Sequence, residues 1–472
     1  MIRGSKLRRS KVTNDVVNST STKWSREWVF FAIVVTVWCL EPLARRLLDW
    51  RSGAFNPIQI MSLVPFLITM AFAYLCLRKG YLKGVSPALK IFGAIWVATF
   101  TFGLFIALFR GSVSAGMYEF IQYVVPMLVG LWLAGQNLDA AEIMRRVALV
   151  VLPLGAVVAI YGLIQFMQPP PWDALWVTGS GFTDSVGSPE PFTMRVFSTL
   201  PSPGPAADFL AFTILLALPY LRIKTIWMWP LVGLLSAALL LTLVREAWVG
   251  LIVGLATFLV VSPSRFRSLP FIIICGVITL FLVSNLPTLL GGVAQGDVLS
   301  SRIATLGDVD HDTSALARQG EIQDALEQSV ENPVGSGLGS FGAASKLSNP
   351  SDPIGNVMDS GYMARLLELG WLGFAGYLFV LVGSFVVLVW ASLWNRRELG
   401  ITRNAQVAAA GAAAIAAALL WADAAGDAHI GLDGFVFWIA LGIGLRSVKA
   451  SSTATAPAVR GVLRGRQRSV TV

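Results

Sequence analysis

An arginine at residue 245 stands out because it interrupts an otherwise apolar run. The run begins at Leu239 and continues through Trp248. A guanidinium group stays protonated, and its planar fork binds phosphate oxygens through two hydrogen bonds, so Arg245 is a candidate phosphate ligand. The alternative is an interfacial arginine that ends a membrane span and extends its charged head toward water.

Asp359 is the carboxylate best suited to act as a general base. It precedes Tyr362, a candidate substrate contact, and an amphipathic run that ends near Gly370. A carboxylate near a membrane can have a raised pKa, which suits proton abstraction from an attacking hydroxyl. Aspartate is also a favoured helix N-cap, so a purely structural role stays open. His429 is a second candidate, as a base or a substrate contact, and its alternative is a polar connection.

Three further arginines are candidate site residues. Arg318 lies in an amphipathic pattern over residues 317–326, which predicts a short helix leading to Asn332-Pro333. Its alternative is a surface salt bridge with a nearby acid such as Glu321. Arg302 and Arg195 are candidate substrate-binding residues, and each could instead be an ordinary loop cation.

A glycine-rich segment, residues 335–342, follows Asn332-Pro333. Glycine lets the backbone approach a ligand closely, which suggests a phosphate-binding loop. No strand precedes it and no Lys-Ser/Thr pair follows it, so a plain turn is an equal alternative. The cysteines have no zinc-type spacing, and we expect neither a metal nor another cofactor.

The composition is that of a membrane protein. Of the 472 residues, 55% are hydrophobic and 13% are charged, whereas a soluble protein has about 25% charged residues. Apolar blocks recur at the length of about 17–25 residues that crosses a bilayer. The blocks are continuous and not alternating, which predicts an all-α polytopic fold and argues against a barrel. The net charge of +9 comes from short loops and tails, so we expect no nucleic-acid partner.

We expect about twelve transmembrane helices in a membrane domain over residues 27–446. The predicted spans are 28–44, 57–77, 87–109, 113–134, 147–168, 205–221, 226–244, 246–262, 269–286, 371–394, 405–422 and 432–446. The basic tails, residues 1–26 and 447–472, are expected to be disordered. Most lysines and arginines fall on one side of this topology, so both termini are expected in the cytoplasm. The long loops 169–204 and 287–358 then face outward, and the second is expected to carry short helices.

The order of these motifs resembles the O-antigen ligase and O-antigen polymerase superfamily of bacterial envelope glycan transferases. The resemblance is clearest over residues 231–383. Its pieces are the span end at residues 242–245, Arg318 ahead of residues 332–339, and residues 359–362 followed by residues 367–373. Residues 195–200 and 208–210 also look like the segment that precedes a span in this family.

The resemblance implies a metal-independent transfer of glycan from undecaprenyl diphosphate to an acceptor at the outer face of the bacterial plasma membrane. It implies that Arg245 and Arg318 grip the diphosphate leaving group. Ligases of the family have a histidine where this chain has Asp359, a residue that is often Asn at Ser360, and a serine at Val244. This departure favours a polymerase of exopolysaccharide, capsule or O-antigen repeat units over a ligase. The implied partners are the carrier-linked glycan, a glycan, lipid or protein acceptor, membrane lipids and other polysaccharide-assembly proteins.

Two other classes of function remain. A transporter of lipid-linked glycan or an anionic solute would use the same cations along a path, and it should place charged residues in the middle of spans. A non-catalytic assembly protein would tolerate substitution of either arginine. The predicted charges lie at span ends and in outer loops, which favours the transferase.

Overall fold

The computed structural model describes residues 24–56, 59–181, 183–221, 228–263, 269–270, 273, 313–348, 358, 360–397, 402–421 and 429–454. Within these residues the regular structure is helical, without a strand. In this described part of the chain, seven helices are long and apolar enough to cross a membrane, and two shorter apolar helices accompany them. The prediction of an all-α polytopic membrane protein is confirmed, whereas the count of twelve spans stays a prediction.

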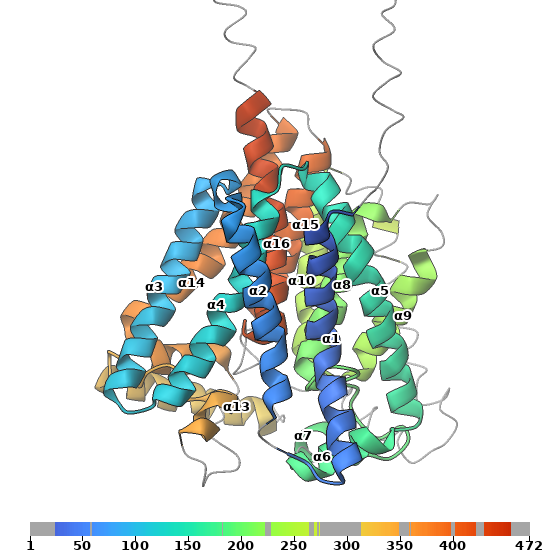
Figure 1. Cartoon of the computed structure of the whole chain (residues 1–472), viewed down its shortest axis with the longest axis vertical. Coiled ribbons are helices and arrows are strands. Elements are labelled where there is room, and N and C mark those ends of the chain that lie inside the picture. The colour runs from blue at the N-terminus through green and yellow to red at the C-terminus, as the bar shows by residue number, and fades with distance from the viewer. Residues whose placement is uncertain are drawn as a thin grey trace, which may run out of the picture.

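The first half of the chain forms five long helices joined by short connections. They are α1 (Arg26–Ser52), α2 (Val64–Arg78), α3 (Pro87–Phe109), α4 (Val113–Gly135) and α5 (Ala140–Met167). The predicted outer loop 169–204 then folds into two short helices, α6 (Pro171–Ser180) and α7 (Thr183–Val186). Both lie at the lower end of the bundle (Figure 1). Sequence periodicity did not predict these two helices because each is so short.

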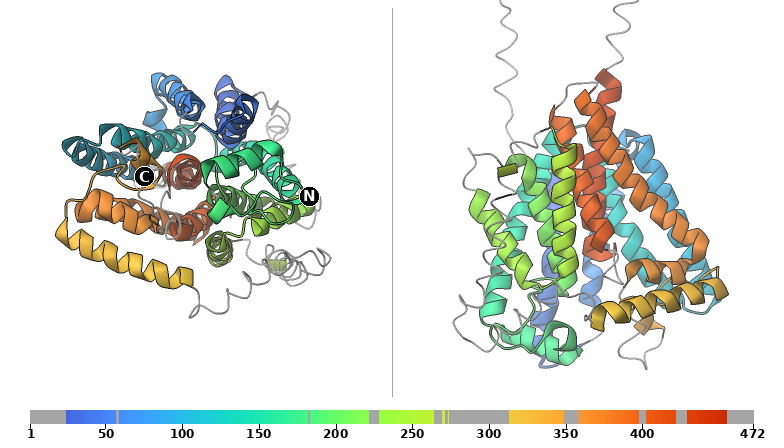
Figure 2. Two further views of the ribbon diagram at one scale, coloured as in Figure 1. Left: turned by 90° about the horizontal axis from the view of Figure 1, so that it is seen from below. Right: turned by 180° about the vertical axis from the view of Figure 1, so that it is seen from behind.

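The second half completes the bundle. Its helices are α8 (Pro203–Ala217), α9 (Met228–Leu241), α10 (Arg245–Val261), α13 (Thr313–Glu331), α14 (Gly361–Arg397), α15 (Thr402–Trp421) and α16 (Gly431–Ala454). Helix α13 lies across the lower end of the bundle, at a steep angle to the spans (Figure 2). We call this end, where α6, α7 and α13 lie, the α13 end.

Two of the predicted divisions between spans coincide with breaks between helices. Arg110 is the C-cap of α3, and α4 begins three residues later. Helix α9 ends at Leu241, and Arg245 is the first residue of α10. Apart from residues 269, 270 and 273, the predicted span 269–286 lies outside the described residues.

Small residues allow α15 and α16 to pack closely in the centre of the bundle. Helix α15 is rich in alanine and is buried along most of its length. A Cβ at Gly411 would come within 3.0 Å of the carbonyl oxygen of Ala440 on α16. The alanine-rich helix therefore packs closely against α16, because Gly and Ala let helix backbones approach.

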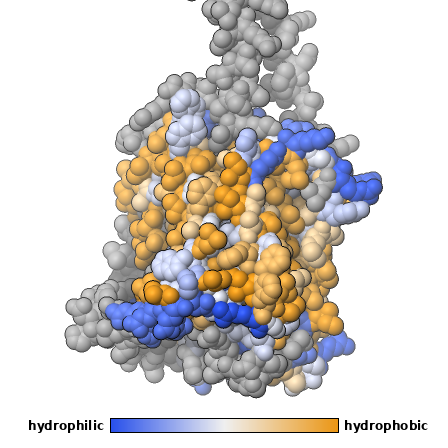
Figure 3. All heavy atoms as spheres, turned by 90° about the vertical axis from the view of Figure 1, so that its left-hand side faces the viewer, coloured by the Kyte–Doolittle hydropathy of each residue, from blue (hydrophilic) through white to orange (hydrophobic). Residues whose placement is uncertain are grey.

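The outer surface has the pattern expected for a membrane span. In Figure 3 a broad hydrophobic belt lies between hydrophilic side chains near the top and a hydrophilic band at the level of α13. Exposed apolar side chains of this kind include Phe105 on α3 and Leu372 and Val386 on α14. In water they would be costly, whereas in lipid they are not.

Candidate functional site

The buried charged side chains gather at one end of the bundle. Among the described residues these are Arg46, Asp49, Glu119, Asp173, Asp208, Arg365 and Glu368. Each lies in α6 or within about two turns of a helix terminus at the α13 end. Charge is costly inside a bilayer, so its confinement to this end marks the part of the molecule where polar chemistry takes place.

Arg195 fixes the turn that carries Arg245. The Arg195 guanidinium donates to the carbonyl oxygens of Thr242 at 3.1 Å, Leu243 at 3.4 Å and Ser185 at 3.0 Å. Leu243 adopts a left-handed conformation with φ 54°, which is uncommon for a residue that carries a Cβ. Arg245 follows directly as the first residue of α10. The fork of Arg195 therefore holds the bend that sets the direction of Arg245, while its predicted role in substrate binding remains a prediction.

The glycine-rich segment packs against protein groups with its backbone N–H donors occupied. The N–H groups of Gly339 and Phe341 each donate to Oε1 of Glu368 at 3.1 Å. The N–H of Gly337 donates to the carbonyl oxygen of Glu368 at 3.0 Å, and that of Leu338 to the carbonyl oxygen of Gly103 at 3.0 Å. These donors are used inside the fold, which favours the turn over the phosphate loop.

Glycine 370 makes this packing possible by interrupting α14. Its backbone has φ 62° and ψ −177° between two helical segments. A Cβ at this position would clash with the carbonyl oxygen of Pro333. The N–H of Trp371 donates to that same carbonyl oxygen at 3.1 Å. The kink therefore locks the end of α13 and the glycine-rich segment onto α14.

Arg365 is the centre of a buried polar cluster beneath this kink. It forms an ion pair with Glu119 on α4 and another with Glu368, at 2.9 Å. It also donates to the hydroxyl of Tyr123, and its guanidinium carbon lies 5.2 Å from the centre of the Tyr123 ring. Two carboxylates share one cation in a nearly dry environment, so the cluster is strongly cross-linked.

The structure gives the backbone position of Arg318 but not of Asp359. Arg318 lies in α13, which ends immediately before Asn332-Pro333 as the amphipathic pattern predicted. Its side chain, Asp359 and Arg302 lie outside the described residues. Helix α14 begins at Gly361, and Ser360 accepts a weak hydrogen bond from the N–H of Met363 at 3.5 Å. The N-cap position of α14 thus belongs to Ser360, which argues against a capping role for Asp359.

His429 lies just before α16 and is buried against Tyr377 of α14 and Phe437 of α16. Its Nδ1 lies 2.9 Å from the Tyr377 hydroxyl, and its Nε2 has no hydrogen-bond partner among the described residues. The side chain is 3% exposed, so a substrate must enter the bundle to reach it. Tyr362 donates from its hydroxyl to the carbonyl oxygen of Leu419 on α15. The proposed substrate contacts of His429 and Tyr362 remain predictions.

Buried Asp208 lies near acidic residues of two other helices, one of which is Glu246, the neighbour of Arg245 in sequence. Asp208 on α8 lies close enough to Asp433 on α16 and Glu246 on α10 for their charges to act on it. Asp208 is 4% exposed. Within the described part of the chain, no group of three or more His, Cys, Asp or Glu side chains has an arrangement that could hold a metal ion.

A second buried pair fastens the segment 169–204 to α1. Arg46 donates to Asp173 at 2.7 Å and to the carbonyl oxygen of Ser198 at 2.6 Å. Asp173 also accepts from Tyr161 at 2.9 Å and from Gln165 at 2.7 Å. Burial raises the pKa of the Asp173 carboxyl, while the positive charge of Arg46 opposes that shift. Both oxygens are satisfied, so this pair is structural.

Sequence reasoning missed most of these buried groups. Arg365, Glu368 and Glu119 were read as parts of apolar or amphipathic runs, and Asp173 as part of a loop. The available signal was the presence of a charge inside a predicted span, as at Glu119 and Asp208. Such residues are rare within membranes and usually face the interior of the bundle.

The apolar helices, with buried charge gathered at one end, define a multi-pass integral membrane protein. Residues 230–378 match the family model described as O-Antigen ligase. This match confirms the predicted resemblance to the O-antigen ligase and polymerase superfamily over that segment, which contains Arg245, Arg318 and Asp359. No curated protein sequence matches the chain.

Proposed function

We propose that this protein polymerises oligosaccharide repeat units linked to undecaprenyl diphosphate, at the outer face of the bacterial plasma membrane. The supporting observation is that all buried charged side chains among the described residues lie at the α13 end. A transporter should also place charges in the middle of its spans. We infer that the α13 end faces outward and that both termini are cytoplasmic.

The proposed reaction is a glycosyl transfer without metal or nucleotide sugar. Arg245 and Arg318 bind the diphosphate and stabilise its developing charge as it leaves. The hydroxyl of an acceptor sugar attacks the anomeric carbon, and the bond from that carbon to the diphosphate oxygen breaks. Asp359 takes the hydroxyl proton. The products are an extended glycan on one carrier and free undecaprenyl diphosphate.

The two arginines of the proposed diphosphate site lie in different local structures. Arg245 is the first residue of α10, where the helix dipole also favours an anion. Arg318 lies on a helix that is joined to α14 by the glycine-rich segment. Arg195 and Arg302 assist in binding, and transfer to a lipid or protein acceptor by a ligase remains the alternative.

Purified protein in liposomes with carrier-linked repeat units tests this proposal. A polymerase produces a ladder of glycan lengths on the carrier without any added acceptor. A ligase leaves the repeat units unchanged until its lipid or protein acceptor is added, and a transporter moves them across the bilayer without elongation. Arg318→Ala should abolish the ladder, whereas Lys346→Ala, which removes an exposed cation near the same end, should not.

A further inference from the structure

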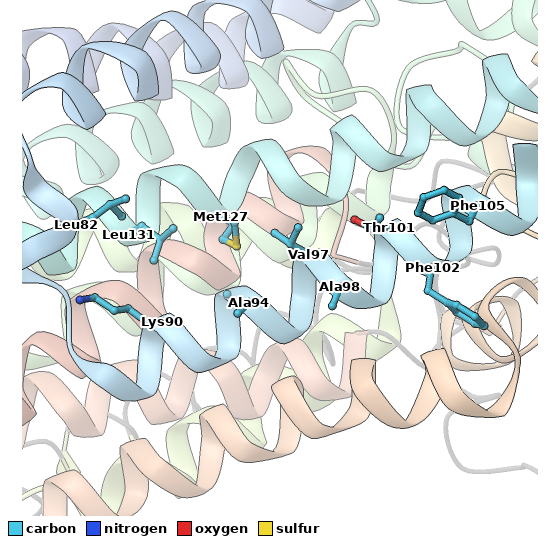
Figure 4. Close-up of a pocket in the computed structure, with 11 residues that line it drawn as sticks. Leu82, Lys90, Ala94, Val97, Ala98, Thr101, Phe102, Phe105, Met127 and Leu131 are labelled. Atoms are coloured by element: carbon cyan, nitrogen blue, oxygen red, sulfur yellow. The ribbon is translucent and has the colours of Figure 1, made fainter.

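A lipid-facing groove runs along α3 and opens beside the glycine-rich segment. Its volume is about 750 Å³. Side chains from α3, α4 and the turn before α3 line it, with Lys90 at one end and Phe105 at the other (Figure 4). The lining between these ends is almost entirely apolar.

Small side chains on one face of α3 create the groove. Ala94, Ala98 and Thr101 follow one another at helical spacing, and Gly93 lies beside them. Met127 of α4 closes the groove from the side, with its sulfur 3.3 Å from a Cβ built at Gly93. A row of small residues next to larger neighbours leaves a channel where an apolar chain can lie.

The length of the groove indicates which kind of lipid chain fits it. Lys90 and Phe105 are 15 residues apart in one α-helix, which corresponds to about 22 Å. Half of a hydrocarbon core of about 30 Å is about 15 Å, the depth that a phospholipid tail of one leaflet fills. The groove therefore crosses the middle of the bilayer, which fits one long flexible chain better than an ordinary acyl chain.

The end of the groove at Phe105 adjoins the glycine-rich segment and the end of α13. Gly103, between the lining residues Phe102 and Phe105, accepts a hydrogen bond from Leu338 of the glycine-rich segment. Arg110, at the end of α3, donates at 3.2 Å to the amide oxygen of Asn332. It forms no ion pair among the residues that the structure describes. The exposed cation of Arg110 therefore lies where the head group of a lipid in this groove would emerge. Its positive charge is complementary to a diphosphate.

We propose that this groove binds the polyisoprenyl chain of the lipid-diphosphate donor, with the diphosphate at the α13 end. The inference rests on the proposed function and adds the place where the carrier is held. The chain gains free energy by packing against the lining, and this contact orients the head group toward the site. Tail length should then control the affinity for the donor.

Groove-filling variants test this assignment. Ala98→Trp and Ala94→Trp place an indole in the groove, whereas Ile91→Trp puts the same side chain on a lipid-exposed position of α3 outside it. Loss of contacts worth about two methylene groups should raise KM for the undecaprenyl donor about tenfold. KM for a farnesyl donor should change less than about twofold. The ratio of the two KM values, which measures the preference for the long tail, should therefore fall.

Photocrosslinking gives a readout without turnover. A benzophenone amino acid at position 98 of the full-length protein is irradiated with undecaprenyl phosphate or with phosphatidylglycerol. An adduct with undecaprenyl phosphate that excess phosphatidylglycerol does not suppress supports the proposal. Adducts with phosphatidylglycerol alone overturn it.

The two proposals fail in different ways. If the wild-type protein elongates glycan and Ala98→Trp keeps the full preference for the long tail, the groove assignment is wrong and the transferase proposal stands. If undecaprenyl phosphate crosslinks at position 98 but the wild-type protein elongates no glycan, the groove stands and the transferase proposal is wrong.

Discussion

The carboxylate of Glu368 on α14 accepts a hydrogen bond from the backbone N–H of Gly339 at 3.1 Å. This contact joins the helix that follows Asp359 to the segment that follows α13, the helix of Arg318. A residue with no predicted role therefore connects the two parts of the chain that the proposed mechanism must hold together.

Two substitutions of Glu368 should separate the contribution of its hydrogen-bond acceptor to stability from the contribution of its negative charge. Glu368→Ala leaves the N–H groups of Gly339 and Phe341 without an acceptor and removes one partner of Arg365, so we expect a loss of about 3–5 kcal/mol in stability. Glu368→Gln keeps an acceptor oxygen and should lose less. Thermal unfolding of the purified variants in detergent checks both. Equal Tm values for the two variants would contradict this account of the contact.

Gly370→Ala should destabilise the kink in α14. The new Cβ would meet the carbonyl oxygen of Pro333, and the left-handed backbone at this position disfavours any side chain. We expect a fall in Tm and loss of glycan elongation. Gly233→Ala is the matched control, because Gly233 lies in α9 with no atom within 4 Å of a built Cβ. The control should be neutral or stabilise the protein by about 0.4–1 kcal/mol.

Arg46 and Asp173 should behave as a coupled buried pair. Arg46→Ala leaves the Asp173 carboxylate buried without its cation, which costs about 3–5 kcal/mol. The double variant with Asp173→Ala should therefore be less destabilised than the sum of the single variants. A double-mutant cycle from thermal unfolding measures this coupling. The same cycle for the partly exposed pair of Arg145 and Glu142 should give about 0–1 kcal/mol, and equal coupling at both pairs would refute the distinction.

Arg195→Lys should reduce activity without loss of the folded protein. A lysine cannot reproduce the planar fork that reaches the carbonyl oxygens of Thr242 and Leu243. The turn would shift Arg245, and a displacement of about 1 Å can lower the rate up to about 100-fold. Elongation kinetics in liposomes measure the effect, with the membrane level of the variant as the control. Unchanged kinetics would mean that Arg195 does not position Arg245.

The sequence was sufficient for the architecture, because hydrophobic blocks of bilayer length are a strong signal. The amphipathic pattern around Arg318 also predicted α13, and the asparagine-proline pair marked its end. Helices α6 and α7 were missed because ten and four residues are too few to show periodicity.

The buried polar contacts could not be predicted. Arg365 and Glu119 are 246 residues apart in sequence, and only the fold brings them together. The glycine-rich segment shows the same limit. Its composition allowed a phosphate loop or a turn, and the deciding fact is that Glu368, 29 residues from Gly339, takes its N–H groups.

The most direct test of the central claim is the glycan profile of a knockout strain complemented with wild type, Arg318→Ala or Asp359→Ala, at equal membrane levels by blot. The account predicts long glycan with wild type and only single repeat units on the lipid carrier in the knockout and with Arg318→Ala. Long carrier-linked glycan that never reaches its acceptor would instead indicate a ligase. A wild-type profile from Arg318→Ala would contradict the arginine-based mechanism.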